Sequence, residues 1–222
     1  MISKKFNLSL NHKIKDFKKI IEVDPDKSIS IRSLLIGAIS QNVSSVKNIL
    51  EFHDVLSAID CLKKLGVKIK KIKPKNYLIF GKGIGSLFIK KNSSLNFGNS
   101  GTLARLLIGI LSTTPNIEIK MRGDESLNKR SMKELIQLMS KFGTLFTPKN
   151  RINFPLKLIS SEMPTAIDYK AGVSAQLKSA VILAGLNANG HTTILEQKNS
   201  RDHTEKMLLR NSHVIKIQNK KK

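Results

Sequence analysis

Apolar residues recur along the chain in three segments that share one helical spacing. The first segment, SISIRSLLIGAIS, carries an apolar stripe at Ile31, Leu34, Leu35, Ala38 and Ile39. This stripe follows the i, i+3, i+4, i+7, i+8 pattern of an amphipathic helix, and the segments SGTLARLLIGILS and SAQLKSAVILAGL repeat it. Each stripe starts three residues after a serine whose hydroxyl can accept a hydrogen bond from a first-turn amide. We therefore expect three helices with N-caps at Ser28, Ser100 and Ser174.

Shorter patterns follow each of these helices. First comes a run rich in β-branched residues, which reads SVKNIL, NIEIKMR and HTTILEQ in the three copies. In the first two copies an amphipathic helix then ends at Gly66 or Gly143, and a hairpin pattern follows in VKIKKIKPKNYLIF and TLFTPKNRINF. The third copy, from Arg201 onward, is looser and keeps only VIKI of its hairpin. The chain is thus predicted to be an α/β (α+β) protein with a unit of roughly 70 residues, α-β-α-β-β, present about three times.

Length and composition favour a globular protein. The chain has 222 residues, of which 40% are apolar, and this is enough for a packed core. No apolar run reaches the length of a membrane span, and the first residues, MISKKFNLSLNHKIK, lack the layout of a signal peptide. We therefore expect a cytoplasmic protein with no membrane partner. The single cysteine, Cys61, fits the apolar rhythm of a helix, so we expect it to be buried, with no disulfide, no metal and no other cofactor.

A formal net charge of +23 indicates an anionic partner. Nucleic acid is one candidate, and a basic, non-catalytic nucleic-acid-binding protein remains an open alternative. The lysines are dispersed along the whole chain, however, and there are only two tyrosines and no tryptophan to stack on bases. We therefore interpret most lysines as a solvated surface, and a subset as attracting small phosphorylated substrates.

Two junctions between a loop and a helix carry more polar groups than capping needs. The segment DPDKSISIR offers an ammonium, a hydroxyl and a guanidinium at Lys27, Ser28 and Arg32, a set suited to a phosphate or carboxylate. In FGNSGTLAR, Gly98 and Gly101 flank Asn99 and Ser100 directly before a helix. Glycines let a backbone approach a ligand closely and present its amides, although a plain glycine-rich turn remains an alternative.

A third junction, RGDESLNKRSM, places Lys129 and Arg130 at the expected start of a helix. Cations at this end oppose the helix dipole unless an anion bridges them. Because the repeat puts the helix N-termini of successive units in equivalent positions, their positive ends should converge on one anion site.

These motifs resemble those of the 5-enolpyruvylshikimate-3-phosphate synthase family. That family has, in order, DKS-x₃-R, GNSGT-x₂-R, GDESL-x-KRPM, SAQ-x-KSA-x₂-LAGL and SRDHTE. In this chain the five motifs run from Asp26 to Glu205. The resemblance implies a fold of βαβαββ units in an inside-out barrel, with roughly three units present here. It also implies that residues 21–222 form the N-terminal domain, incomplete at its C-terminus, and that residues 1–20 belong with the missing C-terminal domain.

The resemblance further implies an activity. The family transfers the enolpyruvyl group of phosphoenolpyruvate to the 5-hydroxyl of shikimate 3-phosphate and releases phosphate, a step of the shikimate pathway toward chorismate and the aromatic amino acids. The implied partners are these two small molecules, with no nucleic acid. The protein itself is expected to be a monomer. The family's acidic proton-transfer residues lie in its C-terminal half, and the family is about twice this length. We therefore expect this chain to hold half an active site, with a truncated inactive fragment as an alternative.

Site residues are carried over motif by motif. The resemblance implies that shikimate 3-phosphate is held by Lys27, Ser28, Arg32, Ser174, Ala175, Gln176, Ser200 and Arg201. It implies that phosphoenolpyruvate, whose place the herbicide glyphosate takes, is held by Lys27, Asn99, Gly101, Arg130 and Gln176, with Lys27 the catalytic residue. One departure is Ser131, which stands where the family usually has proline, so that entry into the next helix is less preorganised. The sister transferase acting on UDP-N-acetylglucosamine is the nearest rival, but its first motif is a lysine-asparagine pair and it lacks GDESL-x-KR.

Overall fold

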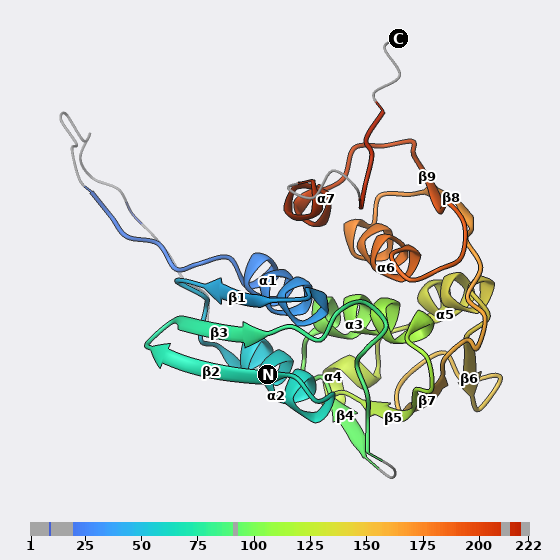
Figure 1. Ribbon diagram of the computed structural model, residues 1–222, viewed down its shortest axis with the longest axis horizontal. Coiled ribbons are helices and arrows are strands. Elements are labelled where there is room, and N and C mark those ends of the chain that lie inside the picture. The colour runs from blue at the N-terminus through green and yellow to red at the C-terminus, as the bar shows by residue number, and fades with distance from the viewer. Residues whose placement is uncertain (1–8, 10–19, 91–92, 210–213, 219–222) are drawn as a thin grey trace.

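The computed structural model describes residues 9, 20–90, 93–209 and 214–218 (Figure 1). Three long helices lie side by side in the middle of the molecule: α1 (Lys27–Ile39), α3 (Gly101–Thr113) and α6 (Ala175–Gly185). They are the three helices that the repeated stripe predicts. The proposed segment 1–20 falls almost wholly outside the described residues, which include only Ser9 and Ile20 of it.

The caps of these helices follow the sequence in two cases of three. The hydroxyls of Ser100 and Ser174 accept from the amides of Leu103 and Leu177, as expected. The prediction for Ser28 is wrong, because α1 begins earlier and its N-cap is Asp26, whose carboxylate accepts from the Ile29 amide at 2.7 Å. Aspartate is as good an N-cap as serine, and it stands three residues before that amide.

Two further helices, α2 (His53–Lys64) and α5 (Lys133–Lys141), are the second helices of the first and second units. Each is followed by a glycine with positive φ, +83° at Gly66 and +92° at Gly143. This left-handed position after the helix end favours glycine, which confirms the predicted stops.

The sheets show that the second unit is complete. Strands β4 (Ser94–Asn96), β5 (Glu118–Arg122), β6 (Leu145–Thr147) and β7 (Leu156–Ile159) form a sheet in the order β4-β5-β7-β6, in which β4 and β5 are parallel. The sheet of the first unit has three strands in the order β1-β3-β2, all antiparallel. They are β1 (Val43–Val46), β2 (Lys68–Lys73) and β3 (Asn76–Phe80). In the third, β8 (Asp168–Ala171) pairs in parallel with β9 (Thr193–Glu196). The unit is therefore βαβαββ, with a leading strand that the hydrophobic pattern alone did not reveal.

Three strand predictions need correction. The first β run is shifted, because β1 spans Val43–Val46 and ends where SVKNIL has barely begun. The second strand of the second hairpin is Leu156–Ile159 rather than RINF, because it is Leu156 and Leu158 that point into the core when this strand pairs with β5. VIKI, residues 214–217, forms no strand after α7 (His203–Leu208). Its apolar residues are exposed, and no neighbouring strand in the described part of the chain takes its backbone hydrogen bonds.

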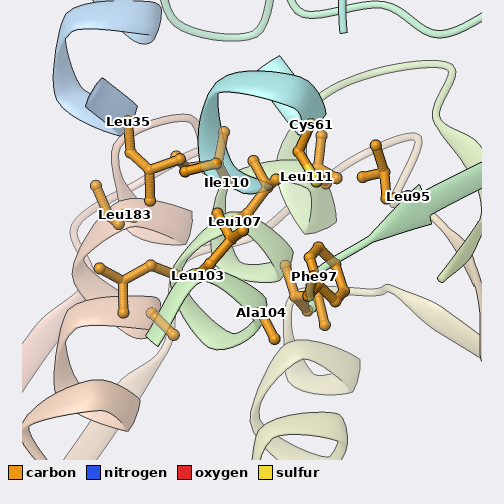
Figure 2. Packing of buried hydrophobic residues seen from close by; sticks show 14 of the residues in the cluster. Leu35, Cys61, Leu95, Phe97, Leu103, Ala104, Leu107, Ile110, Leu111 and Leu183 are labelled. Atoms are coloured by element: carbon orange, nitrogen blue, oxygen red, sulfur yellow. The ribbon is translucent and has the colours of Figure 1, made fainter. Parts of the chain in front are cut away.

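The core lies around helix α3, whose residues are all buried except Arg105. Figure 2 shows its apolar side chains between those of the other helices and sheets: Leu35 and Leu183 on one side, and Cys61, Leu95 and Phe97 on the other. Cys61 is buried as predicted, and burial raises the pKa of its thiol to about 12. At Gly109 a Cβ would lie 2.5 Å from the carbonyl oxygen of Ala180, so that α3 and α6 cross in close backbone contact.

Part of the positive charge has a structural role at a sheet edge. Strand β2 is the outer strand of the first sheet and carries Lys68, Lys70, Lys71 and Lys73. Lysines on an exposed edge discourage pairing with a second molecule. None of the helices among the described residues is long and apolar enough to span a membrane. Nor do three or more metal-ligating side chains gather anywhere in this part of the chain.

Candidate functional site

A cavity of about 920 Å³ opens where the first turns of four helices meet. Its wall includes Lys27 of α1, Asp54 of α2, Thr102 of α3 and Gln176 of α6, each within the first two residues of its helix. The amide ends of helices carry partial positive charge and attract anions. The convergence that the repeat predicts is therefore present.

The cavity brings together five of the residues singled out from the sequence. Its lining contains Lys27, Asn99, Gly101, Arg130 and Gln176. These are the five residues that the resemblance assigns to phosphoenolpyruvate. They come from all three units, so the repeated architecture is what assembles them.

Lys27 is anchored by a carboxylate. Its Nζ lies 2.8 Å from Oδ2 of Asp54, a side chain that is only 10% exposed. Asp54 lies in the first turn of α2, where a negative charge is favourable. It also fixes the direction in which Lys27 points, a second role that local sequence does not reveal.

Arg130 faces the cavity from a bend between two helices. The short helix α4 (Glu125–Asn128) ends before it and α5 begins only at Lys133, so the expectation that Arg130 starts a helix is wrong. The predicted conflict with a helix dipole is therefore absent. The guanidinium donates to Asn99 Oδ1 at 2.6 Å and to Ser126 Oγ at 3.3 Å. Ser131, in the place of the usual proline, accepts from the Lys133 amide at 3.2 Å and so pairs the first amide of α5, whose N-cap residue is Met132.

Arg105 is a site residue that sequence reasoning did not single out. Its Nη1 donates to the Gly101 carbonyl at 3.2 Å and to Gln176 Oε1 at 3.0 Å, and Gln176 in turn donates through Nε2 to Thr102 Oγ1 at 3.1 Å. Burial, and then repulsion from Arg130, lower the pKa of Arg105. The sequence did contain a signal for Arg105, because this residue stands one helical turn after Gly101 in the glycine-rich motif FGNSGTLAR.

Gly101 makes room for one of the two guanidiniums in this wall. A Cβ at this position would lie 2.7 Å from Nη1 of Arg105 and 3.5 Å from Nη1 of Arg130. Glycine therefore leaves the space that the Arg105 guanidinium occupies, whereas Arg130 would stay at an ordinary contact distance.

The residues assigned to shikimate 3-phosphate alone do not line this cavity. Ser28, Ser174, Ala175, Ser200 and Arg201 lie outside its lining. The Ser174 hydroxyl is used as the cap of α6, and both the amide and the hydroxyl of Ser200 donate to Glu196 Oε1. The assignment of these residues to a ligand stays a prediction.

Arg32 is buried between helices rather than directed into the cavity. It is 3% exposed, and its guanidinium donates to the Ser28 carbonyl at 3.1 Å, to Thr204 Oγ1 at 2.8 Å and to Ser179 Oγ at 3.2 Å. Burial lowers its pKa, and the nearby carboxylate of Glu205 opposes that effect. Arg32 therefore ties α1 to α6 and α7.

Comparison with known proteins now adds an independent line of evidence. Residues 11–222 match the family described as EPSP synthase (3-phosphoshikimate 1-carboxyvinyltransferase). The protein of that name from Bacillus subtilis (strain 168) is 44% identical over 189 residues, which are 85% of this chain and 44% of the relative. The one from Paramagnetospirillum magneticum is 39% identical over 197 residues, 88% of this chain and 44% of the relative.

A solved structure agrees with the sequence matches. EPSP synthase from Acinetobacter baumannii is 36% identical and superposes with a TM-score of 0.78 over 85% of this chain and 42% of its own. The predicted α/β fold of the enolpyruvyl transferase type is thereby confirmed. The chain spans less than half the length of the relatives it matches. The cavity, the repeated unit and these matches lead to one conclusion: the chain belongs to the EPSP synthase family.

Proposed function

We propose that this chain binds phosphoenolpyruvate and shikimate 3-phosphate for transfer of the enolpyruvyl group between them. In that reaction the 5-hydroxyl oxygen of shikimate 3-phosphate bonds to C2 of phosphoenolpyruvate, and the bond from C2 to the phosphate oxygen breaks. Inorganic phosphate leaves, and the hydroxyl proton passes to the surrounding groups. On this proposal residues 21–222 form the N-terminal domain, and residues 1–20 belong with the other domain.

The observation that carries the proposal is a group of three cations in the lining of the cavity, which also contains the carboxylates of Asp54, Asp60 and Asp124. Lys27, Arg105 and Arg130 direct an ammonium and two guanidiniums to a hollow that already receives helix N-termini. Phosphoenolpyruvate brings a phosphate and a carboxylate, the two groups that guanidiniums bind best. Such fixed charges also stabilise the negative charge that moves onto the leaving phosphate.

The substrates are tested by binding. We expect isothermal titration calorimetry to show saturable binding of shikimate 3-phosphate to the 222-residue chain. Shikimate, which keeps its carboxylate but lacks the phosphate, is the matched control and should bind at least about tenfold more weakly, because the charge-assisted hydrogen bonds to the phosphate are lost. Equal affinity for the two ligands would refute the proposal for this chain.

A second measurement separates the enzyme family's ligands from a general attraction for anions. Binding of shikimate 3-phosphate to a built site should survive a rise in salt that removes binding to double-stranded DNA, because contacts to many backbone phosphates depend steeply on salt. Tight DNA binding that persists at physiological salt, together with no preference for shikimate 3-phosphate, would support the nucleic-acid alternative instead.

A further inference from the structure

Lys178 is a lysine whose side chain is buried, which is unusual in a protein core. It lies in helix α6, and its side chain is only 2% exposed. Its Nζ is 2.8 Å from Oε1 of Glu196 and 2.6 Å from Oε1 of Glu205. A buried ammonium costs several kcal/mol unless it is paired, and two carboxylates supply the pairing here.

The two carboxylates stand on either side of one loop. Glu196 is the last residue of β9 and Glu205 lies in α7, so the segment 197–202 connects the two elements that hold Lys178. Glu196 Oε1 also accepts from the amide and from the hydroxyl of Ser200, at 2.7 Å and 2.8 Å. One carboxylate oxygen is therefore shared by the buried ammonium and by the residue predicted to bind phosphate.

The ion pairs favour the charged forms of Lys178 and Glu196. Burial disfavours the charged form of Lys178, but the two carboxylates outweigh it and raise its pKa. Burial also disfavours the charged form of Glu196, but hydrogen bonds from Lys178 and Ser200 outweigh it and lower the pKa. Glu205 lies close enough to Arg32 to oppose the lowering of the pKa of that guanidinium by burial. The buried Lys178 ammonium thus joins α6 to β9 through Glu196 and to α7 through Glu205.

Lys178 connects these ion pairs to the start of α6. Its backbone amide donates to the carbonyl of Ser174, one turn earlier and the cap of the helix. The same residue is therefore linked through its backbone to the Ser174, Ala175 and Gln176 stretch, and through its side chain to Ser200. These are the two stretches of the third unit that the resemblance assigns to shikimate 3-phosphate.

We propose that Lys178 is a positioning residue for the phosphate of shikimate 3-phosphate, a proposal that rests on the function above. Lys178 touches no ligand in this role. It fixes the Glu196 carboxylate, which fixes Ser200 and with it Arg201, so that the loop and the first turn of α6 act on the same phosphate. Without the ammonium, Glu196 becomes a poorly compensated carboxylate that turns toward solvent and releases Ser200.

The test replaces Lys178 by methionine, which has a similar length and no charge. We expect Lys178→Met to accelerate hydrogen exchange of the Ser200 amide, measured by NMR, and to weaken binding of shikimate 3-phosphate about tenfold, the loss that one charge-assisted hydrogen bond represents. Lys170→Met is the matched control, because Lys170 is an exposed lysine in the same unit and should change neither quantity.

A purely structural role makes a different prediction. It would lower the free energy of unfolding but leave both the Ser200 exchange rate and the affinity of the folded protein unchanged, and that result would overturn the proposal. A double variant sharpens the distinction. Ser200→Ala removes the hydroxyl contact to Glu196 and keeps the contact of the backbone amide, so adding Lys178→Met to it should cost less affinity than Lys178→Met costs alone, because the two changes act in part on one interaction.

Two further outcomes remain informative. If Lys178→Met does not fold, Glu196→Gln carries the test, since Lys178 keeps its pair with Glu205 while the charge that receives Ser200 is removed. If the unaltered chain fails to bind shikimate 3-phosphate, the proposed function fails. The exchange rate of the Ser200 amide then still decides whether Lys178 positions the loop.

Discussion

Gly109 controls how closely helices α3 and α6 approach, and its replacement by alanine tests the packing beneath the site. An added Cβ would lie 2.5 Å from the carbonyl oxygen of Ala180 and 2.9 Å from its Cα, whereas ordinary contacts of this kind begin at 3.4 Å. The two helices must therefore separate by about 0.9 Å at this crossing, because neither partner is a side chain that can rotate away.

The expected loss of stability follows from two opposing effects. Overpacking of a well-packed core costs about 1–3 kcal/mol, and a clash with backbone atoms belongs at the upper end of that range. Alanine is a better helix former than glycine, and this difference offsets up to about 1 kcal/mol of the cost of overpacking. We therefore expect Gly109→Ala to lower the free energy of unfolding by about 2 kcal/mol.

Urea unfolding followed by circular dichroism measures this difference, and the chain offers a matched control. A Cβ at Gly172 would meet no heavy atom within 4 Å, so Gly172→Ala should change the free energy of unfolding by less than about 0.5 kcal/mol. If both variants unfold at the same urea concentration, the close crossing of α3 and α6 is not what limits the packing, and the reasoning is refuted.

Three other predictions concern charged groups. Asp54→Asn should lower the free energy of unfolding by about 1 kcal/mol at low salt, since it removes both the partner of Lys27 and a favourable charge at a helix start, and the loss should shrink in molar salt. Arg105→Lys keeps the charge but loses the fork that holds Gln176, so calorimetry should show about tenfold weaker binding of phosphoenolpyruvate with little change in stability. Hydrogen bonds, chiefly from a tyrosine hydroxyl, lower the pKa of Glu51 to about 2. Its stabilising effect should therefore be complete above about pH 4.5 and be lost as the pH falls toward 2, so that Glu51→Gln flattens the stability profile measured by urea unfolding across that interval.

Helical spacing and capping chemistry predicted the skeleton of this fold because both are local. The stripes before Gly66 and Gly143 and the caps at Ser100 and Ser174 depend on residues within a few positions of one another. The leading strands β4 and β8 escaped detection because they span only three and four residues, too few for an alternation to show. Their pairing with β5 and β9 comes from the fold, and no local pattern encodes it.

The candidate site shows the same difference between features that depend on local sequence and features that depend on the fold. The residues that a ligand would meet stand in glycine-rich or basic junctions, so Lys27, Asn99 and Arg130 were visible in the sequence. The contacts around the site were not, because they join distant residues: Arg105 meets Gln176, 71 positions away. Arg32 was also visible, but its burial against Thr204, 172 positions away, was not. A hydrophobic pattern also assigns every lysine to solvent, and for Lys178 that assignment is wrong.

The ion pairs of Lys178 in the third unit compensate for a sheet that contributes little to stability. In the described part of the chain β9 pairs only with β8, and a two-stranded sheet is marginally stable without further support. The first two units fix their loops with strands on both sides and with apolar side chains from a common core. In the third unit, directed ionic contacts from Lys178 hold Glu196 and Glu205, the residues before and after the segment 197–202. Such contacts specify one geometry more sharply than apolar packing does, because a displaced buried charge loses its partner at once. On the function proposed above, this loop presents Ser200 and Arg201 to a phosphate, a task that needs a defined geometry more than it needs a large contribution to stability.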